Sequence, residues 1–475
     1  MNELDVDLCV IGGGSAGLSA AAIAAQFGAR VVLIERGAMG GECLNIGCVP
    51  SKALLSAARS AHAMRAAARF GIEAVEPRVD FAAVHAHVRG VIAAIAPHDS
   101  VERFEGLGVQ VIQAEARFVA PRVLVAGGQR IRARRVIIAT GSRPATPPID
   151  GLGDVPYFTN ETIFDNTALP EHLLIVGGGP IGLEMAQAHR RLGARVTVLE
   201  HSLALPHDDA EQVRELLKML AAEGVTIRQN VEVKRLRRSA AGIIASVEEG
   251  GQAGEVEASH LLVAAGRQPQ LEALDLGQAD VHHDDEGIVV DDKLRTSARG
   301  VFAIGDAVAR APHFTHVAGY HAGIAVQNAL LLPYAKTDYA SLPWVTYSDP
   351  ELAHVGLDEE QARRQHGGDV QVIRVPMSGN DRAQTERTTA GAIKLIARRN
   401  GRVLGVSILD TDAGELAGLW VLAIRSGLKL GKIARMIAPY PTLGEVSKAV
   451  AGEFYKPRLF GPLSRRVVRL FSFLP

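Results

Sequence analysis

The strongest constraint on this chain is a segment that occurs twice. LCVIGGGSAGLSAAAIAAQFGARVVLIE, Leu8 to Glu35, aligns without a gap with LLIVGGGPIGLEMAQAHRRLGARVTVLE, Leu173 to Glu200. Each copy reads as an apolar strand, a G-x-G-x-x-G turn, a helix, a Gly-Ala-Arg break and a second strand that ends in glutamate. This order predicts two βαβ units and therefore an α/β fold with two Rossmann-like domains.

Three glycines in each copy are expected to have separate tasks. The first makes a tight turn, the second lets the backbone approach a pyrophosphate, and the third lets the helix pack closely. The helix N-terminus holds the phosphates, and the closing glutamate accepts hydrogen bonds from ribose hydroxyls. Glycines also serve ordinary turns, so a single copy would be weak support. The predicted residues are Gly12, Gly14, Gly17 and Glu35 at the first site, and Gly177, Gly179, Gly182 and Glu200 at the second.

Two dinucleotide sites suggest one bound cofactor and one exchanging coenzyme. Hydride transfer between a nicotinamide and a flavin fits that arrangement. At the second site Glu200 would repel a 2′-phosphate, and no arginine takes its place, although His201 follows it. NADH is therefore favoured over NADPH as the coenzyme.

Length and charge narrow the class of protein further. A chain of 475 residues suggests about three domains. The net charge of -1 and the absence of a nucleic-acid-reading motif argue against a nucleic-acid partner. No leader sequence opens the chain, and no stretch approaches the roughly 18 apolar residues that span a bilayer. We therefore expect a cytoplasmic location.

Two of the three cysteines lie close together. Cys9 belongs to the first apolar strand and is expected in the core, whereas Cys43 and Cys48 flank a Gly-containing turn at a helix start. Backbone N–H groups and the helix dipole would stabilise a thiolate there, so the pair can form and break a disulfide. Incidental buried thiols and a zinc half-site are the alternatives, but no second Cys/His pair follows with ligand spacing. We predict no resident metal.

The segment GGECLNIGCVPSKALL, Gly40 to Leu55, resembles the active-site signature of the class I pyridine nucleotide-disulfide oxidoreductases, which include dihydrolipoyl dehydrogenase, glutathione reductase and mercuric reductase. The resemblance extends to Ala139-Thr140-Gly141, to AGRQP at 265–269 and to VFAIGD at 301–306. It implies an FAD-dependent enzyme with an FAD domain, an inserted NAD domain and a C-terminal α/β dimerisation domain that builds a homodimer. The implied ranges are 1–150 and 269–340 for the FAD segments, 151–268 for the NAD domain, 341–457 for the dimerisation domain and 458–475 for a tail.

The resemblance also implies roles for single residues. Cys48 would face the flavin, and Cys43 would exchange with substrate. Lys52 lies four residues after Cys48, on the same helix face, so its ammonium would be available to the bound flavin, and the family pairs it with a glutamate that matches Glu184. Asp306 would contact the ribityl chain, although Gly-Asp alone would be a plain turn. Further cofactor-binding positions implied by the resemblance are Thr140, Gly141 and Gly266.

The chain departs from the family where the disulfide-substrate members have His-Pro-Thr-x-x-Glu, whose histidine reaches across the dimer as acid/base for the exchange cysteine. This chain has Tyr440-Pro-Thr-Leu-Gly-Glu445 instead, and the resemblance implies catalytic positions for Tyr440 and Glu445. An imidazole titrates near pH ~6.5 and can shuttle a thiol proton, whereas a phenol stays protonated to about pH 10. Turnover of lipoamide or glutathione disulfide is therefore doubtful. A tyrosine at this position resembles the pattern of mercuric reductase, although the C-terminus of this chain lacks the cysteine pair of that enzyme. A core aromatic is the alternative for Tyr440, and a surface helix residue for Glu445.

Three smaller features concern the surroundings of the cysteines. Glu42 replaces the usual threonine and would raise the pKa of the Cys43 thiol unless it is simply solvated. Pro180 stands where glutathione reductase has its tyrosine gate. His316 could approach the flavin, but a core or capping role is at least as plausible.

The C-terminal segment KPRLFGPLSRRVVRLFSFLP combines five basic residues with apolar ones and no acidic residue. Such a tail suits an anionic membrane surface, and packing on the dimer partner is the alternative. Together these features predict an NADH-driven flavoprotein whose Cys43–Cys48 pair reduces a metal ion, a small disulfide or another electrophile. The alternatives are a dihydrolipoyl dehydrogenase and, in another class, a redox-sensing or electron-delivery protein at the membrane surface.

Overall fold

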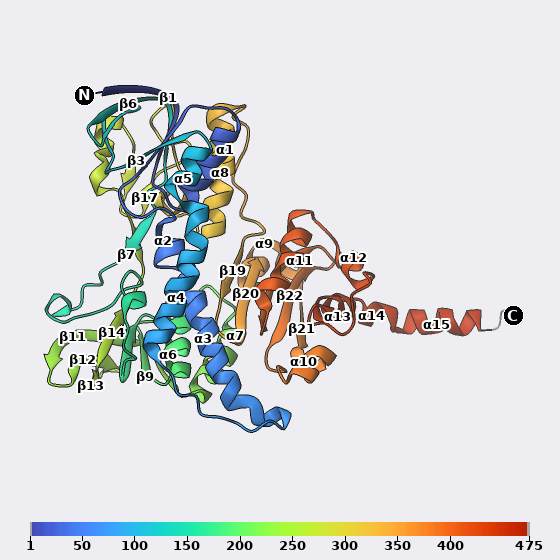
Figure 1. Ribbon diagram of the computed structural model, residues 1–475. Coiled ribbons are helices and arrows are strands. Elements are labelled where there is room, and N and C mark those ends of the chain that lie inside the picture. The colour runs from blue at the N-terminus through green and yellow to red at the C-terminus, as the bar shows by residue number, and fades with distance from the viewer. Residues whose placement is uncertain (1, 473–475) are drawn as a thin grey trace.

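The structure is a computed structural model that describes residues 2–472. It contains three α/β bodies, and a helix projects from the C-terminal one (Figure 1). The predicted α/β class with two Rossmann-like units is confirmed. Residues 473–475 of the predicted tail lie outside the described part, and the domain boundaries stay predictions.

The first body is a seven-stranded sheet in the order β3-β2-β1-β6-β5-β4, with β18 also paired to β6. Strand β1 pairs in parallel with β2 and β6, and β18 pairs in parallel with the end of β6. Cys9 on β1 is fully buried, as predicted. The elements are β1 (Asn2–Ile11), α1 (Ser15–Gln26), β2 (Val31–Glu35), α4 (Phe81–Ile95), α5 (Val101–Gly106), β3 (Val109–Gln113), β4 (Arg117–Ala120), β5 (Val123–Ala126), β6 (Gln129–Ile138), β18 (Val301–Ala303) and α8 (Thr315–Leu330).

The second body repeats the βαβ arrangement in a four-stranded parallel sheet, β10-β9-β8-β14. A three-stranded antiparallel sheet, β11-β12-β13, packs beside it through a shared apolar cluster. The elements are β8 (His172–Val176), α6 (Pro180–Leu192), β9 (Arg195–Glu200), α7 (Ala210–Ala222), β10 (Val225–Gln229), β11 (Val231–Ser239), β12 (Gly242–Glu249), β13 (Gln252–Ala258) and β14 (His260–Val263).

The third body is a five-stranded antiparallel sheet in the order β19-β20-β23-β22-β21, with α11 packed against β20 and β23. The fully buried Trp420 of α11 lies in its core. The elements are β19 (Pro343–Thr346), β20 (Glu351–Gly356), α9 (Glu359–His366), β21 (Val370–Pro376), α10 (Asp381–Glu386), β22 (Ala392–Arg398), β23 (Val403–Asp410), α11 (Ala413–Arg425), α12 (Leu430–Ala434) and α13 (Glu445–Glu453).

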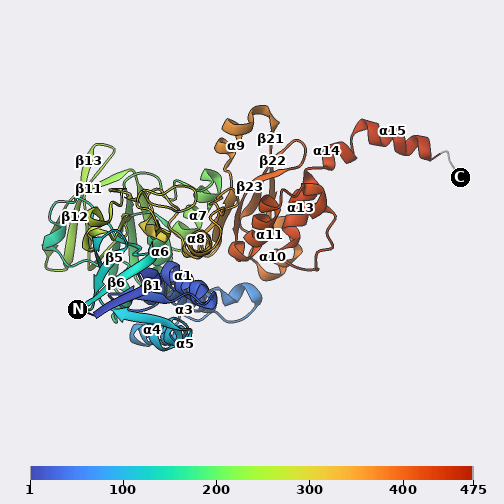
Figure 2. The ribbon, with the colours of Figure 1, turned by 90° about the horizontal axis from the view of Figure 1, so that it is seen from above.

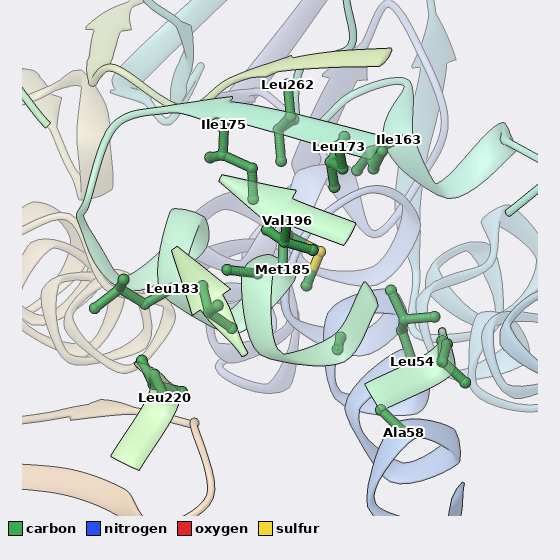
Figure 3. Close-up of a cluster of buried hydrophobic side chains, with 14 of the residues drawn as sticks. Leu54, Ala58, Ile163, Leu173, Ile175, Leu183, Met185, Val196, Leu220 and Leu262 are labelled. Atoms are coloured by element: carbon green, nitrogen blue, oxygen red, sulfur yellow. The ribbon is translucent and has the colours of Figure 1, made fainter. Parts of the chain in front are cut away.

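Helix α3 (Cys48–Ala66) ties the first body to the second. Its Leu54 and Ala58 side chains lie in one buried apolar cluster with Leu183 and Met185 of α6 (Figure 3). Burying a leucine side chain contributes about 2 kcal/mol, so this shared core holds α3 firmly against α6. A short ribbon of β7 (Ser142–Pro144) and β15 (Arg267–Pro269) forms a second link between these bodies.

The C-terminal segment forms α14 (Lys456–Leu459) and α15 (Pro462–Phe471). Helix α15 extends away from the rest of the molecule in two perpendicular views (Figures 1 and 2). Among residues 2–472, no helix combines the length and the apolar character needed to cross a membrane.

Candidate active site

The glycine-rich turn of the first unit needs glycine for steric reasons. Gly12 has φ +107°, and a Cβ there would lie 2.3 Å from the Ala139 carbonyl oxygen. A Cβ on Gly17 would lie 1.8 Å from the Gly12 carbonyl oxygen. The turn also orients Glu35, whose carboxylate accepts hydrogen bonds from the backbone N–H groups of Gly13 and Gly37. The carboxylate therefore stands beside the loop that would hold a pyrophosphate.

The second unit reproduces this geometry. Gly177 has φ +118°, and its Cβ would lie 2.3 Å from the Ala264 carbonyl oxygen. A Cβ on Gly182 would lie 2.0 Å from the Gly177 carbonyl oxygen. The Glu200 carboxylate accepts a hydrogen bond from the Gly178 N–H at 2.6 Å. Two sequence copies have thus folded into two equivalent nucleotide cradles.

The two cysteines lie at neighbouring helices. Cys43 belongs to α2 (Gly41–Asn45), and Cys48 is the first residue of α3, where unpaired N–H groups favour an anion. Both are free thiols; Cys43 is half-buried and Cys48 is exposed toward a cavity. The Cys48 sulfur lies 3.5 Å from the Thr315 hydroxyl at the start of α8.

The thiols have opposite electrostatic environments. A hydrogen bond from Cys43 lowers the pKa of Cys48 to about 6, and Thr315 and the Lys52 ammonium act in the same direction. The same hydrogen bond, together with burial, raises the pKa of Cys43. The surroundings therefore favour Cys48 over Cys43 as the more acidic thiol of the reduced pair.

Lys52 is held in place by groups from two other bodies. Its Nζ lies 2.8 Å from Glu184 Oε2 on α6 and 4.3 Å from the centre of the Tyr347 ring. The other Glu184 oxygen accepts a hydrogen bond from the Tyr347 N–H at 2.9 Å. Glu184 is buried, so leaving it without the Lys52 ammonium would be costly. The ammonium is thereby fixed near Cys48.

Glu42 is only partly exposed and is ion-paired, so it is not simply a solvated carboxylate, and it is not among the main causes of the raised pKa of Cys43. Its carboxylate forms a bidentate ion pair with Arg267 and accepts a hydrogen bond from the Asn160 amide at 2.9 Å. Burial raises the pKa of Glu42, against the pull of Arg267. The raised pKa of Cys43 comes instead from Cys48 and from burial. Glu42 thus fastens the redox loop to β15.

Asp306 lies in the same network. Its Oδ2 accepts a hydrogen bond from the Ser142 hydroxyl at 2.6 Å, and Arg267 Nε lies 3.8 Å from that oxygen. Nearby, the buried Thr140 hydroxyl has no partner within the described residues. Such an orphaned hydroxyl indicates that a polar ligand is missing from its surroundings.

A single cavity of about 1700 Å³ connects these groups. It runs from the first glycine turn past the cysteines to the third body. Its lining includes the predicted positions Gly12, Gly14, Glu35, Cys43, Cys48, Lys52, Thr140, Gly141, Glu184 and Asp306.

Several predicted positions stand elsewhere. Gly177, Gly179, Gly182, Glu200 and Gly266 do not line this cavity, and neither do Tyr440 and Glu445. Tyr440 is 70% exposed, so it is no packed core aromatic within one chain. Its hydroxyl donates to Asp381 at 3.0 Å, and that hydrogen bond raises the pKa of Tyr440. Glu445 is the half-buried first residue of α13.

The sequence prediction missed Thr315, Arg267 and Tyr347. Thr315 stands directly before His316, the residue of that segment for which the sequence allowed an approach to the flavin. His316 bonds the Pro343 carbonyl oxygen through Nε2 at 2.9 Å, and burial lowers its pKa. Arg267 belongs to a motif quoted for the resemblance, but its partner Glu42 is 225 positions away in the chain. No local pattern indicated that contact.

Two family models match the chain. Residues 6–322 match the pyridine nucleotide-disulphide oxidoreductase model, and residues 342–451 match the dimerisation domain of those enzymes. Two dinucleotide-type βαβ units and a thiol pair in one chain are typical of oxidoreductases that exchange electrons between dinucleotides and thiols. The chain belongs to the pyridine nucleotide-disulphide oxidoreductases.

Individual relatives cover nearly the whole chain. A mercuric reductase of Streptomyces lividans is 37% identical, over 94% of this chain and 96% of its own. A dihydrolipoyl dehydrogenase of Thermus scotoductus is 36% identical, over 95% and 97% of the two chains. The Cu(II) complex of the HOCl-induced flavoprotein disulfide reductase RclA from Escherichia coli superposes with a TM-score of 0.84 at 28% identity, covering 94% of this chain and 99% of that one.

Family membership makes the protein an FAD-dependent enzyme that uses a pyridine nucleotide. The predicted resemblance and enzyme class are confirmed. The dimerisation domain supports the predicted homodimer.

Proposed function

We propose that the enzyme oxidises NADH and reduces a soft metal ion through Cys43 and Cys48, with Hg(II) as the leading substrate. The observation that carries this proposal is the pair of free cysteines, Cys43 and Cys48, that line one cavity, because soft metal ions prefer thiolate ligands. The relatives named mercuric reductase support the choice of Hg(II). The tyrosine at position 440 supports it as well, since disulfide-reducing members of the family have histidine there.

The first cradle fits FAD. Gly12, Gly14 and Glu35 would hold the adenosine and pyrophosphate half, while Asp306 and the unpartnered Thr140 hydroxyl offer polar contacts farther along the cavity. When bound, FAD accepts a hydride from the nicotinamide and supplies the electron pair that opens the Cys43–Cys48 disulfide. The remaining site positions, Gly17, Gly141 and Gly266, would shape the loops around it.

The residues around the thiols divide their tasks. Lys52, held by Glu184, stabilises the Cys48 thiolate, while Cys43 keeps its proton until a metal ion displaces it. Arg267 and Glu42 keep the redox loop in place. We assign Tyr440 and Glu445 to the substrate side of the site in a second copy of the chain, because the matching histidine of the disulfide-reducing members acts across the dimer; consistent with this, neither residue lines the cavity of its own chain.

The second cradle would hold NADH through Gly177, Gly179, Gly182 and Glu200. The Glu200 carboxylate is aimed at the Gly178 turn, where a ribose would lie, and a 2′-phosphate would meet its negative charge. NADPH is therefore the weaker coenzyme.

The decisive experiment is an anaerobic NADH titration followed by a panel of acceptors that includes Hg(II), Cu(II), quinones, lipoamide and glutathione disulfide. We expect Hg(II) to give the highest kcat/KM. Cys43→Ser and Cys48→Ser should each lose metal-ion turnover by about a thousandfold or more, as expected when a reacting group is removed. Full activity of both serine variants towards every acceptor would rule out the dithiol route.

Dihydrolipoyl dehydrogenase is the second candidate function, and the relative from Thermus scotoductus favours it. In that case lipoamide turnover would exceed Hg(II) turnover in the same panel. If the protein is a dihydrolipoyl dehydrogenase, Tyr440→His should change lipoamide turnover little. If the protein is a metal-ion reductase in which Tyr440 prevents lipoamide turnover, Tyr440→His should raise that turnover instead.

A further inference from the structure

Helix α15 is amphipathic, and its apolar face is not buried against any other part of residues 2–472. None of its residues is buried. Its large apolar side chains are between 43% and 75% exposed, and they are Leu463, Val467, Val468, Leu470 and Phe471. Soluble proteins seldom leave so continuous an apolar stripe uncovered, so it indicates a partner surface.

The two faces of the helix are cleanly separated. At 100° per residue, the five apolar side chains fall within an arc of about 160°, which also contains the small Ser464. Arg465, Arg466 and Arg469 occupy the opposite arc. Helices of this pattern lie in the plane of a membrane surface, with apolar side chains among the acyl chains and arginines at the headgroups.

Charge identifies the kind of surface. Residues 456–472 contain five basic side chains and no acidic one, whereas the whole chain has a net charge of -1. The remainder of the protein is therefore net negative, and an anionic surface would attract the tail while repelling the body. Each basic residue near an anionic leaflet strengthens binding by about fivefold.

The connection to the body gives the helix room to lie flat on a membrane. Leu459 and Phe460, just before Gly461, are also exposed and extend the apolar surface. The helix begins at Pro462, after an extended Gly461, and points away from all three bodies (Figures 1 and 2). The nucleotide cradles would thus stay accessible while α15 is bound.

We propose that α15 is a peripheral membrane anchor that binds anionic lipid headgroups through its arginines and inserts its apolar face at the acyl boundary. The anchor brings the enzyme to the surface without spanning the bilayer. This inference is independent of the electron acceptor and holds for any substrate of the Cys43–Cys48 pair.

The test uses the full-length FAD-loaded enzyme in vesicle co-sedimentation. Vesicles of phosphatidylcholine with an equal amount of phosphatidylglycerol should sediment the protein, and vesicles of phosphatidylcholine alone should sediment it at least about tenfold less. High salt should weaken the binding because screening shortens the range of the headgroup charge.

Three variants separate charge from apolar contact. Replacing Arg465, Arg466 and Arg469 together by glutamate should lower the partition coefficient by about a hundredfold or more. Replacing the same three by lysine keeps the charge and should bind within a few-fold of the wild type. Replacing Leu463, Val467 and Leu470 by glutamine should abolish binding although all arginines remain. NADH oxidation should be equal in all variants and reports intact folding.

Two results would overturn the anchor. One is a failure of the vesicle assay: either the wild type sediments equally with both vesicle types, or the glutamine variant sediments with anionic vesicles as well as the wild type does. The other is dissociation of the dimer by the glutamine substitutions in sedimentation velocity, because α15 would then pack on a second copy of the chain.

Discussion

The two βαβ units have the same backbone geometry at their glycine turns and differ in the segments that cover those turns. Gly12 and Gly177 have nearly the same φ, and in each unit a Cβ would meet a carbonyl oxygen at 2.3 Å. Gly14, however, faces the redox loop: a Cβ on Gly41 would lie 2.6 Å from the Gly14 Cα. Nothing lies within 4 Å of a Cβ built on Gly179.

This difference fits the proposal that the first cradle holds a resident cofactor and the second an exchanging coenzyme. The first cradle is roofed by α2 and opens into the long cavity, which suits a group that stays through many turnovers. At the second cradle, α6 begins with the exposed residues Pro180 and Ile181, which line the same cavity, and no atom approaches a Cβ on Gly179 within 4 Å; this openness suits a coenzyme that arrives and leaves. Under that proposal, equal sequence motifs would serve ligands of unequal residence time, because neighbouring elements decide access to each turn.

The largest expected effect comes from the first glycine of each unit. Gly12→Ala places a Cβ against the Ala139 carbonyl at positive φ, so we expect FAD retention after gel filtration to fall about a hundredfold. Gly177→Ala should instead keep stoichiometric FAD while kcat/KM for NADH falls about a hundredfold. Loss of FAD from both variants to the same extent would break the proposed division between the cradles.

A smaller effect is expected at Gly41, which covers the first cradle, and at Gly179, which lies uncovered in the second. Gly41→Ala should weaken FAD binding about tenfold, because φ is +58° and the new Cβ meets the Gly14 Cα. Gly179→Ala should raise only the KM for NADH, with FAD content and thermal unfolding unchanged. Flavin fluorescence during dialysis and a thermal melt measure these outcomes. Tight FAD binding by the Gly41→Ala variant would show that the roof is unimportant.

The two closing glutamates offer a third distinction. Glu200→Gln removes the charge that opposes a 2′-phosphate, so the ratio of kcat/KM for NADPH to that for NADH should rise by about tenfold. Glu35→Gln should leave this ratio unchanged and lower FAD retention instead. Steady-state kinetics with both coenzymes provide the measurement, and an unchanged ratio in Glu200→Gln would remove Glu200 from coenzyme choice.

The smallest expected effect concerns the thiolate between the units. The pKa of Cys48 is lowered to about 6, so Cys48 is a thiolate above that pH and a thiol below it. Alkylation of the reduced enzyme by iodoacetamide should therefore rise through pH 6 and level off above it. Lys52→Gln removes a cation that favours the thiolate, and the midpoint should move up by about one pH unit. A midpoint unaffected by this substitution would contradict the role of Lys52.

Much of the fold follows from local patterns. The alternation of apolar strand, glycine turn and helix is encoded within each repeat, because backbone sterics at Gly12 and Gly177 act over a few neighbouring residues. The start of α3 at Cys48 was likewise predictable from the turn that precedes it. The pairing of Lys52 with Glu184 was implied only by the resemblance, since 132 positions separate the two.

Other parts of the site depend on contacts between distant segments. Sequence reasoning placed a free carboxylate beside Cys43, but the fold brings Arg267 to Glu42 and Thr315 to Cys48. Tyr347 reaches Lys52 only because the third body packs against α6. No pattern within a short window reports such approaches.

The sequence by itself determined the two nucleotide units, the redox-active pair and the departure at Tyr440, because each depends on residue types at fixed short spacings. Only the tertiary structure decided which cradle is roofed, which thiol carries the charge and how Glu42 is compensated. These properties depend on distance and burial, and folding sets both by packing segments that lie far apart in the chain.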